Sequence, residues 1–446
     1  MIPTAKKAVL AVMVMWMVLL IPCLCRAADE QPSLRGSIED RYRYRSDGNV
    51  TDQDMFQRLS LDYFRPWRDA QVGFVFLGLL EEDLDKNPPA NQYFPFREVS
   101  DAYKGSTAGW LYLAYAELDT QGFVQSARVG RQEILELEPI AFDGGLVSVR
   151  LWKKISLTAF GGVPVNLFES DHNGDSVAGA YVEYRVLRSL ALTAGYLRLR
   201  DRVEMLDGAK ETLHADLVAM KAFWRPMRGL DFTLRGTMQD GEFRDATARA
   251  SFRNYDWDVL LTAYYAAQFI ERDAAPLNQD PFAIILGPYQ PYEQAGFTAY
   301  KGIGKYLGVE GGAMFRELFN KGKESVYNHD YSRYLATLYL YKLPFKGSQW
   351  TVGADWWSSP GNVHSQSIRG EFMQRFMKRG KFFIGATYDL YKVDELTGQE
   401  TSDVRTYYIG ATIPTGKHFY VGADYRFEDS DVRQTDAFNA RLGYEF

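Results

Sequence analysis

The last eleven residues of the chain, 436–446, read DAFNARLGYEF. From Phe438 onward the even positions are apolar or aromatic, and the last of them is the terminal Phe446. The odd positions carry Asn439, Arg441, Gly443 and Glu445. A β-strand points successive side chains to opposite faces. This stretch therefore predicts a strand with one apolar and one polar face.

The same alternation recurs along the chain from about residue 34. It is clearest in residues 34–44, 230–238, 246–252, 350–356 and 419–427. Strict alternation over such lengths is typical of strands that separate two environments. We count about 22 such segments, with 18 or 20 as alternatives, since bacterial barrels have even strand numbers. The weakly periodic ones span 107–118, 145–152, 295–303 and 330–343.

The connections between these segments alternate between short and long. Short turns fall near residues 66–69 and 225–229, and long polar segments span roughly 82–105 and 270–294. This layout is typical of an up-and-down barrel with short periplasmic turns and long extracellular loops. A sheet in hydrocarbon must close, because unpaired backbone groups are too costly there. We therefore predict an all-β fold, a single transmembrane antiparallel β-barrel over residues 28–446, with a soluble solenoid or sandwich as the alternative.

Residues 1–27 have the layout of a signal peptide. Lys6 and Lys7 form a basic start, residues 8–22 are apolar, and residues 25–27 offer a small-x-small cleavage site. A retained anchor helix is the alternative. Both cysteines of the chain lie in this segment. The mature chain is therefore expected to have no disulfide, no thiolate metal site and no covalent haem attachment.

Composition narrows the class of protein. Aromatic residues make up 15% of the chain, and after residue 22 no apolar run approaches the roughly 20 residues that a membrane-spanning helix needs. Removing residues 1–27 removes Lys6, Lys7 and Arg26 and no acid, so 51 basic residues become 48 against 57 acidic ones, a net charge of −9. This acidic balance argues against nucleic-acid binding, which needs a basic face.

The end of the chain carries a first resemblance. A two-faced strand that ends on an aromatic residue resembles the C-terminal assembly signature of bacterial outer-membrane barrels. The resemblance implies that the barrel-assembly machinery recognises Phe446 and that the outer wall contacts outer-membrane lipid. Together with the signal peptide, it predicts a location in the outer membrane of a Gram-negative cell.

The polar phase of the strands is expected to line the interior. In the eight most regular segments it carries eleven basic and eight acidic side chains, which predicts a mixed-charge, slightly basic and hydrated lumen. Charged rings set ion selectivity, so we expect a weak anion preference, the alternative being that the charges only satisfy one another. The best candidate for an anion-attracting patch is the group Arg41, Arg43, Arg45 and Arg58. The residues expected to line the pore are Arg35, Arg41, Arg43, Arg45, Arg58, Asp62, Arg128, Arg131, Asp231, Arg235, Asp245, Arg249, Asp355, Asp424, Arg426 and Arg441.

A barrel of this size is expected to have its lumen narrowed or filled. Inward-folded loops are one solution, and 82–105 and 270–294 are the candidates; a second protein in the lumen is the other. The sequence predicts no enzyme, no cofactor and no metal. None of the five histidines is paired at metal-ligand spacing, and residues 83–87 begin like a calcium loop but have Pro88 where glycine is required.

Residues 127–151 read ARVGRQEILELEPIAFDGGLVSVRL. The Gly130-Arg131-Gln132 end of one strand, followed by Phe142-Asp143-Gly144 at the next, resembles the signature stretch of alginate-export-like outer-membrane porins. The resemblance implies a monomeric barrel of about 18 strands that passes solutes or anionic polysaccharide through a basic lumen. The higher strand count and the mixed wall predicted here depart from that pattern.

A looser resemblance is to the barrel sheaths of porin–cytochrome electron conduits, in size and in the empty lumen. It implies a separate multihaem cytochrome inside the barrel, because this chain has no haem motif of its own. We therefore predict a passive outer-membrane channel for small hydrophilic or anionic solutes, with a sheath around such a cytochrome as the alternative.

Overall fold

The computed structural model describes residues 33–85, 96, 107–165, 174–204, 210–270, 290–321, 329–358, 364–377, 379–393 and 400–446. The predicted signal peptide, residues 1–27, lies outside these residues. Within them, no helix has the length and apolar character needed to cross a membrane.

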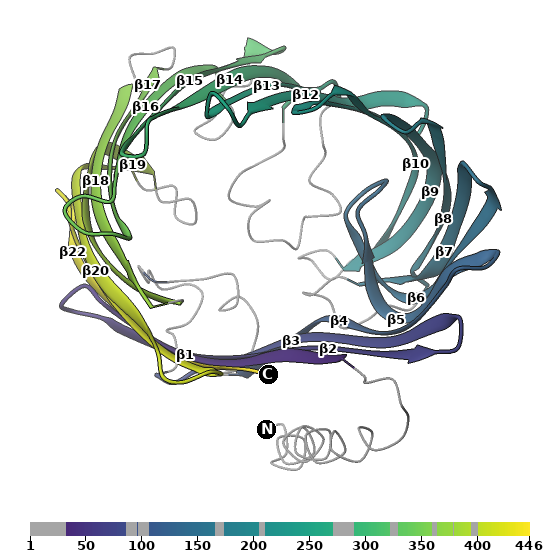
Figure 1. The fold of residues 1–446 in the computed structure, drawn as a ribbon, viewed down its shortest axis with the longest axis horizontal. Coiled ribbons are helices and arrows are strands. Elements are labelled where there is room, and N and C mark those ends of the chain that lie inside the picture. Colours follow the sequence, from purple (N-terminus) through teal and green to yellow (C-terminus); the bar gives the residue numbers. More distant parts are fainter. Residues whose placement is uncertain are drawn as a thin grey trace.

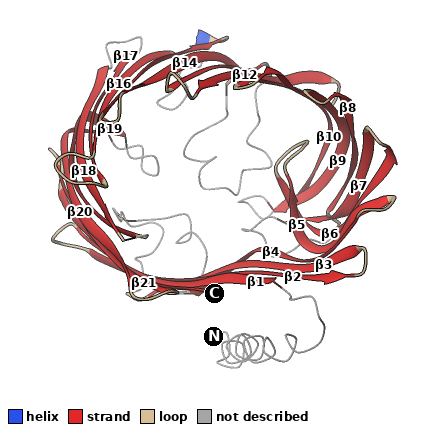
Figure 2. Cartoon of the chain, viewed as in Figure 1, coloured by secondary structure: helices blue, strands red, loops and turns tan. Residues whose placement is uncertain are grey.

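The described chain forms one ring of antiparallel strands, viewed end-on in Figure 1 and coloured by secondary structure in Figure 2. Each strand pairs with its neighbours in sequence, and the last strand pairs with the first. The prediction of a closed 22-stranded barrel is therefore confirmed. The strands are β1 (Ser33–Ser46), β2 (Thr51–Trp67), β3 (Ala70–Asp83), β4 (Thr107–Thr120), β5 (Val124–Ile134), β6 (Ile140–Trp152), β7 (Ile155–Pro164), β8 (Ser176–Leu187), β9 (Leu190–Glu204), β10 (Lys210–Met227), β11 (Leu230–Gln239), β12 (Glu242–Asn254), β13 (Val259–Gln268), β14 (Tyr292–Ile303), β15 (Leu307–Leu318), β16 (Tyr331–Tyr341), β17 (Ser348–Ser358), β18 (His364–Phe376), β19 (Gly380–Val393), β20 (Glu400–Pro414), β21 (Phe419–Asp429) and β22 (Gln434–Glu445).

The seam between β1 and β22 closes the ring. The backbone N–H of Gly36 donates to the carbonyl oxygen of Phe446 at 3.0 Å, and the N–H of Phe446 donates to the carbonyl of Gly36 at 3.0 Å. A side chain at Gly36 would collide with the Phe446 ring, 2.6 Å from the position of its Cβ. The C-terminal residue is thus bonded into the sheet and packs on the first strand, which leaves no free strand edge at this point.

Connection length alternates around the ring, as predicted. The links from even-numbered to odd-numbered strands are short, such as 68–69 between β2 and β3 and 153–154 between β6 and β7. The long links, such as 84–106 and 269–291, join odd-numbered to even-numbered strands and so lie at the other end. Residues 240–241 are a short link at that end. The first strand begins and the last strand ends at the end of the short turns, because the strand number is even.

The weakly periodic segments are strands in the structure as well. The main difference concerns β5 and β6, which together are longer than the sequence pattern indicates and leave only residues 135–139 between them. The extra length carries the motif quoted above, and its buried side chains belong to the candidate site.

Candidate functional site: the inner wall of the barrel

The wall has two faces, because the register keeps equivalent phases of neighbouring strands together. On one face, Leu234 of β11 lies opposite Ala248 of β12, and its side chain is 54% exposed. On the other face, the neighbouring Thr233 lies opposite Arg249. The predicted separation of apolar and charged phases therefore extends across strand pairs.

One short segment identifies the charged face as the inner one. The connection between β5 and β6 lies inside the ring in Figure 1, and it contacts the charged face of β11 and β12. Arg235 of that face donates to the carbonyl oxygen of Leu137 at 2.5 Å and to the Glu138 carboxylate at 3.0 Å. We call residues 134–140 the inner segment.

The register places fifteen of the sixteen expected pore-lining residues in the inner phase. These are Arg35, Arg41, Arg43, Arg45, Arg58, Asp62, Arg128, Asp231, Arg235, Asp245, Arg249, Asp355, Asp424, Arg426 and Arg441.

Arg131 is the exception: it was expected to line the pore, but its position lies on the outer face. It is opposite Ala114 and Asp143, and it forms an ion pair with Asp143 at 2.6 Å. Its neighbour Gln132 is buried in the inner phase, whereas Val129, two residues before Arg131, is exposed in the outer phase. The alternation thus continues through Gly130, and the odd position turns Arg131 outward.

The expected anion-attracting patch is largely neutralised by acids on the next strand. Arg43 pairs with Asp54 at 2.7 Å, and Arg45 pairs with Asp52. Arg58 lies opposite Glu39 in the β1–β2 register. The sequence analysis did not predict the roles of Asp52 and Asp54. The available signal was that each acid lies opposite an arginine of opposite charge across the β1–β2 turn.

Arg41 differs from the rest of this group. It lies opposite Phe56 on one side and opposite Arg441 on the other, across the seam. Its guanidinium lies 5.4 Å from the Phe56 ring centroid and donates to Asn439 at 3.2 Å. Arg441 donates to the Thr412 hydroxyl at 2.9 Å. Two like charges thus face each other across the seam on the inner wall.

Other inner charges pair across neighbouring strands. Arg128 of β5 binds the buried Glu117 of β4 at 3.0 Å, directly opposite in the register. Arg333 of β16 binds Asp355 of β17, with its Nε 2.9 Å from a carboxylate oxygen. Paired charges of this kind keep a wall polar at a lower desolvation cost than isolated ones.

The inner wall is apolar between β6 and β10, which the sequence analysis did not anticipate. Ile134 and Leu137 of the inner segment pack there, and Leu137 is 2% exposed. The wall side chains in this cluster are Phe142, Leu146, Phe160, Val177, Tyr181, Leu197, Leu217 and Ala219. Burial of so much apolar surface anchors the inner segment against the wall.

Gly195 of β9 provides the space for Leu137. A Cβ at this position would lie 2.6 Å from Leu137 Cδ2, 2.6 Å from Tyr181 Cβ and 2.7 Å from the Ala180 carbonyl oxygen. Only glycine fits such a close approach without movement of its neighbours.

A charged contact ties the inner segment to the next part of the ring. Glu138 Oε2 accepts from Arg235 at 3.0 Å and from Arg244 at 2.7 Å. The Arg244 side chain is 5% exposed, and its Nε also donates to Asp245 at 2.5 Å. Sequence reasoning assigned Arg244 to neither face and did not single out Glu138.

A β-bulge brings Arg244 to this contact. Thr237 of β11 pairs with Asp245, whereas the next residue, Met238, pairs with Phe243, so Arg244 is the extra residue. A bulge places two successive residues opposite one and redirects a side chain. By alternation alone, Arg244 would share the outer phase of Ala246.

The expected constriction loops lie mostly outside the described residues. Within 82–105, Phe96 is described, and it is buried against Arg45, which donates to its carbonyl oxygen at 3.0 Å. Within 270–294, residues 290–294 are described, and Gln294 belongs to the inner phase of β14.

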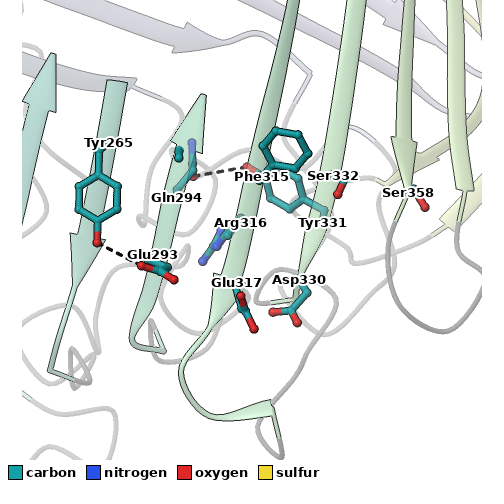
Figure 3. Close-up of a pocket in the computed structure, with 11 residues that line it drawn as sticks. Tyr265, Glu293, Gln294, Phe315, Arg316, Glu317, Asp330, Tyr331, Ser332 and Ser358 are labelled. Carbon is teal, nitrogen blue, oxygen red and sulfur yellow. Dashed lines mark hydrogen bonds between the residues drawn. The ribbon is translucent and has the colours of Figure 1, made fainter. Parts of the chain in front are cut away.

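A hollow of about 640 Å³ lies among strands β13 to β17, at the strand ends where the long connections begin and end. Figure 3 shows its lining, with Tyr265 donating to Glu293 at 3.1 Å and Tyr331 donating to Gln294 at 3.5 Å. Arg316 stacks over Tyr292, 4.1 Å from the ring centroid. The residues of this hollow come from both phases of the strands, so it is a feature of the rim rather than of the lumen.

Two loop carboxylates near the same end have shifted pKa values. Burial raises the pKa of Asp85, just beyond β3. The pKa of Asp431 is lowered, because its carboxylate accepts from the hydroxyl of Ser402 at 2.6 Å and from its N–H at 3.0 Å. The Asp431–Ser402 contact is therefore expected to persist at neutral pH. Among the described residues, no group of three His, Cys, Asp or Glu side chains could hold a metal ion.

Comparison with known proteins gives a likeness of fold. No family model and no curated protein matches the chain, so the resemblance to alginate-export-like porins stays an expectation. Among solved structures, the translocation pore of the P pilus usher PapC is similar with a TM-score of 0.51 and 7% identity, over 92% of this chain and 99% of that one.

Pseudomonas aeruginosa OccK8 (OprE) is similar with a TM-score of 0.46 and 11% identity, over 93% of this chain and 98% of that one. Pseudomonas aeruginosa OccK2 (OpdF) is similar with a TM-score of 0.46 and 13% identity, over 93% and 97%. At these identities the likeness is one of barrel architecture.

Proposed function

We propose that this protein is a channel of the Gram-negative outer membrane that passes small hydrophilic or anionic solutes. The observation that carries the proposal is the closed ring with opposite chemistry on its two faces. An apolar outer face suits lipid, and a charged inner face suits water, as in barrels that leave an aqueous lumen.

The outer surface supports a membrane location. Large apolar side chains are exposed on it around the whole ring, far beyond the patches that soluble monomers show. Examples on well-separated strands are Met220, Leu234, Phe297, Val352, Ile368, Val421 and Leu442. Such a surface is stable in hydrocarbon and unstable in water.

Aromatic residues gather at both ends of the strands, where the two membrane interfaces would lie. At the end with short turns the exposed ones include Trp67, Phe123, Trp152, Trp257, Tyr306 and Phe345. At the other end Phe269 contacts the tilted ring of Phe243 and stacks on Phe319, with ring centroids 5.1 and 6.0 Å apart. Aromatic groups at opposite strand ends match the two interfacial girdles of an outer-membrane barrel.

The inner charges suggest a weak anion preference rather than a strong one. Arg43 and Arg45 pair with wall acids, so they add little net field. Arg41 and Arg441 lie opposite each other at the seam, so the wall carries two basic side chains at one place. Charged side chains at the wall set which ions enter a pore.

The inner segment favours a channel over a sheath for a cytochrome. Residues 134–140 lie against the inner wall from β6 to β12, so a protein that filled the lumen would have to fit around this segment or displace its buried apolar cluster. A narrowed aqueous pore needs no such rearrangement.

Solute flux into proteoliposomes tests the proposal. We expect vesicles containing the folded barrel to swell in an isosmotic pentose and to swell much less in a tetrasaccharide. Lipid vesicles without protein serve as the control. Absence of swelling in every solute, with insertion shown by resistance to external protease, would contradict a channel.

A further inference from the structure

The contact between Glu138 and two arginines differs from the other ion pairs on the described inner wall. Arg43–Asp54 and Arg128–Glu117 join wall residues that lie directly opposite each other on adjacent strands. Glu138 instead comes from a connecting segment and reaches wall residues about a hundred positions later. Its carboxylate therefore binds the wall from a connecting segment and is not itself part of a wall strand.

The two guanidinium groups converge on a single oxygen. Arg235 of β11 and Arg244 of β12 bind Glu138 Oε2 at 3.0 and 2.7 Å. Arg244 reaches this point only because of the bulge opposite Thr237 and Met238. Two guanidinium groups fixed on one oxygen form the geometry that recognises a carboxylate.

Without Glu138, the wall residues at this contact carry a net positive charge. Asp245 neutralises part of it through Arg244 Nε. Arg235, Arg244 and Asp245 together carry one positive charge, and Arg235 Nε is buried without a hydrogen-bond partner. The wall thus has unused donor capacity, which an anion can satisfy.

The inner segment does not depend on Glu138 for its position. Ile134 and Leu137 are almost fully buried in the apolar cluster, and the Arg235 guanidinium also holds the Leu137 carbonyl oxygen. Glu138 can therefore leave the arginines while the rest of the segment stays in place.

We propose that Arg235 and Arg244 form a carboxylate-binding site on the inner wall, that Glu138 fills it in the resting channel, and that carboxylate-bearing solutes compete with Glu138 for it. This inference rests on the proposed channel function and names the solute class and the contact that such a channel would use. Glu138 acts as a tethered substitute for the solute's carboxylate.

The test compares Glu138→Gln with Glu133→Gln, using gluconate as the probe. Glu133 lies in the outer phase of β5, opposite Ala141, so its replacement changes the net charge equally without touching the site. In planar bilayers we expect gluconate to block E138Q saturably, with a half-blocking concentration about tenfold below that of the wild type, since one charge-assisted contact has this scale. E133Q should match the wild type.

A second variant assigns the block to the arginines. Adding Arg244→Gln to E138Q should abolish the saturable block. Equal gluconate block in the wild type, E133Q and E138Q would overturn the proposal, and so would a block that survives loss of Arg244.

Thermal unfolding in detergent separates this inference from the channel function. Gluconate should raise the melting temperature of E138Q and leave unchanged that of the double variant in which Arg244→Gln is added to E138Q. If gluconate shifts the melting temperature of a protein that never conducts, the site is supported and the channel function is refuted. If the protein conducts but gluconate neither blocks the current nor shifts the melting temperature, the channel function is supported and the site is refuted. Should E138Q fail to fold, Glu138→Asp keeps the charge on a shorter side chain and should show a smaller shift in the same direction; a shift no larger than that of the wild type would then overturn the proposal.

Discussion

Arg441 of the last strand lies directly opposite Arg41 of the first, on the inner face of the seam that closes the barrel. Arg41 donates to the side chain of Asn439, and Arg441 donates to the Thr412 hydroxyl. Like charges that face each other across strands are destabilising. The placement of two arginines opposite each other is therefore expected to cost the barrel some stability.

Replacing Arg441 with Gln should lower the preference for anions and leave the barrel at least as stable. Relief of the cross-strand repulsion is worth about 0.2–1 kcal/mol. The reversal potential in a salt gradient measures the preference, and unfolding in urea measures the stability. Arg405→Gln, in the outer phase opposite Tyr388 and Asp429, is the control for charge alone and should not move the reversal potential. An unchanged potential in R441Q would contradict the assigned role.

Arginine at Leu234 should destabilise the barrel by about 2–4 kcal/mol near the bilayer midplane. The neighbouring Thr233 is the matched position, since it lies on the inner face opposite Arg249. There an added charge meets water and one like charge, and the cost should be below about 1 kcal/mol. Folding into lipid vesicles measures both free energies. Equal costs would mean that the two faces are assigned the wrong way round.

Replacing Gly195 with Val should force Leu137 away from the wall, because no Cβ fits beside the Leu137 side chain. Overpacking of this kind costs about 1–3 kcal/mol. With the inner segment shifted, we expect single-channel conductance to change and its noise to increase. Gly370→Val is the control, since a Cβ at Gly370 meets nothing within 4 Å. Identical conductance in G195V and the wild type would show that the inner segment does not shape the pore.

Deletion of Phe446 should reduce the amount of barrel assembled in the outer membrane. The residue closes the seam through two backbone hydrogen bonds to Gly36, and it is the proposed recognition point of the assembly machinery. Heat-modifiable mobility on gels counts the assembled fraction. Phe446→Tyr keeps an aromatic terminus and the backbone bonds, so it should assemble normally. Equal yields for the deletion and the wild type would argue against both roles.

The two-faced wall was predictable because its signal is local. A period of two is visible within each strand, as at Thr233 and Leu234, and alternation of short and long links set the antiparallel ring. The charge matches between β1 and β2 were predictable in principle, yet Asp52 and Asp54 were missed because the apolar phase is weak at the start of β2.

The inner segment was not predictable from periodicity, because its partners lie several strands away. Arg244 depends on a bulge, and Arg131 depends on how far the alternation continues through Gly130. One signal was available in β8, where Val177 and Tyr181 are apolar in the phase that should face water. A strand that is apolar on both faces of a wet barrel indicates that something covers it from inside.

The most direct test of the account is the current carried by single inserted barrels in a planar bilayer. A closed ring with a hydrated, slightly basic wall predicts discrete ohmic steps and a reversal potential displaced toward that of the anion in a salt gradient. Silent bilayers, with insertion of the folded protein demonstrated, would contradict the central claim.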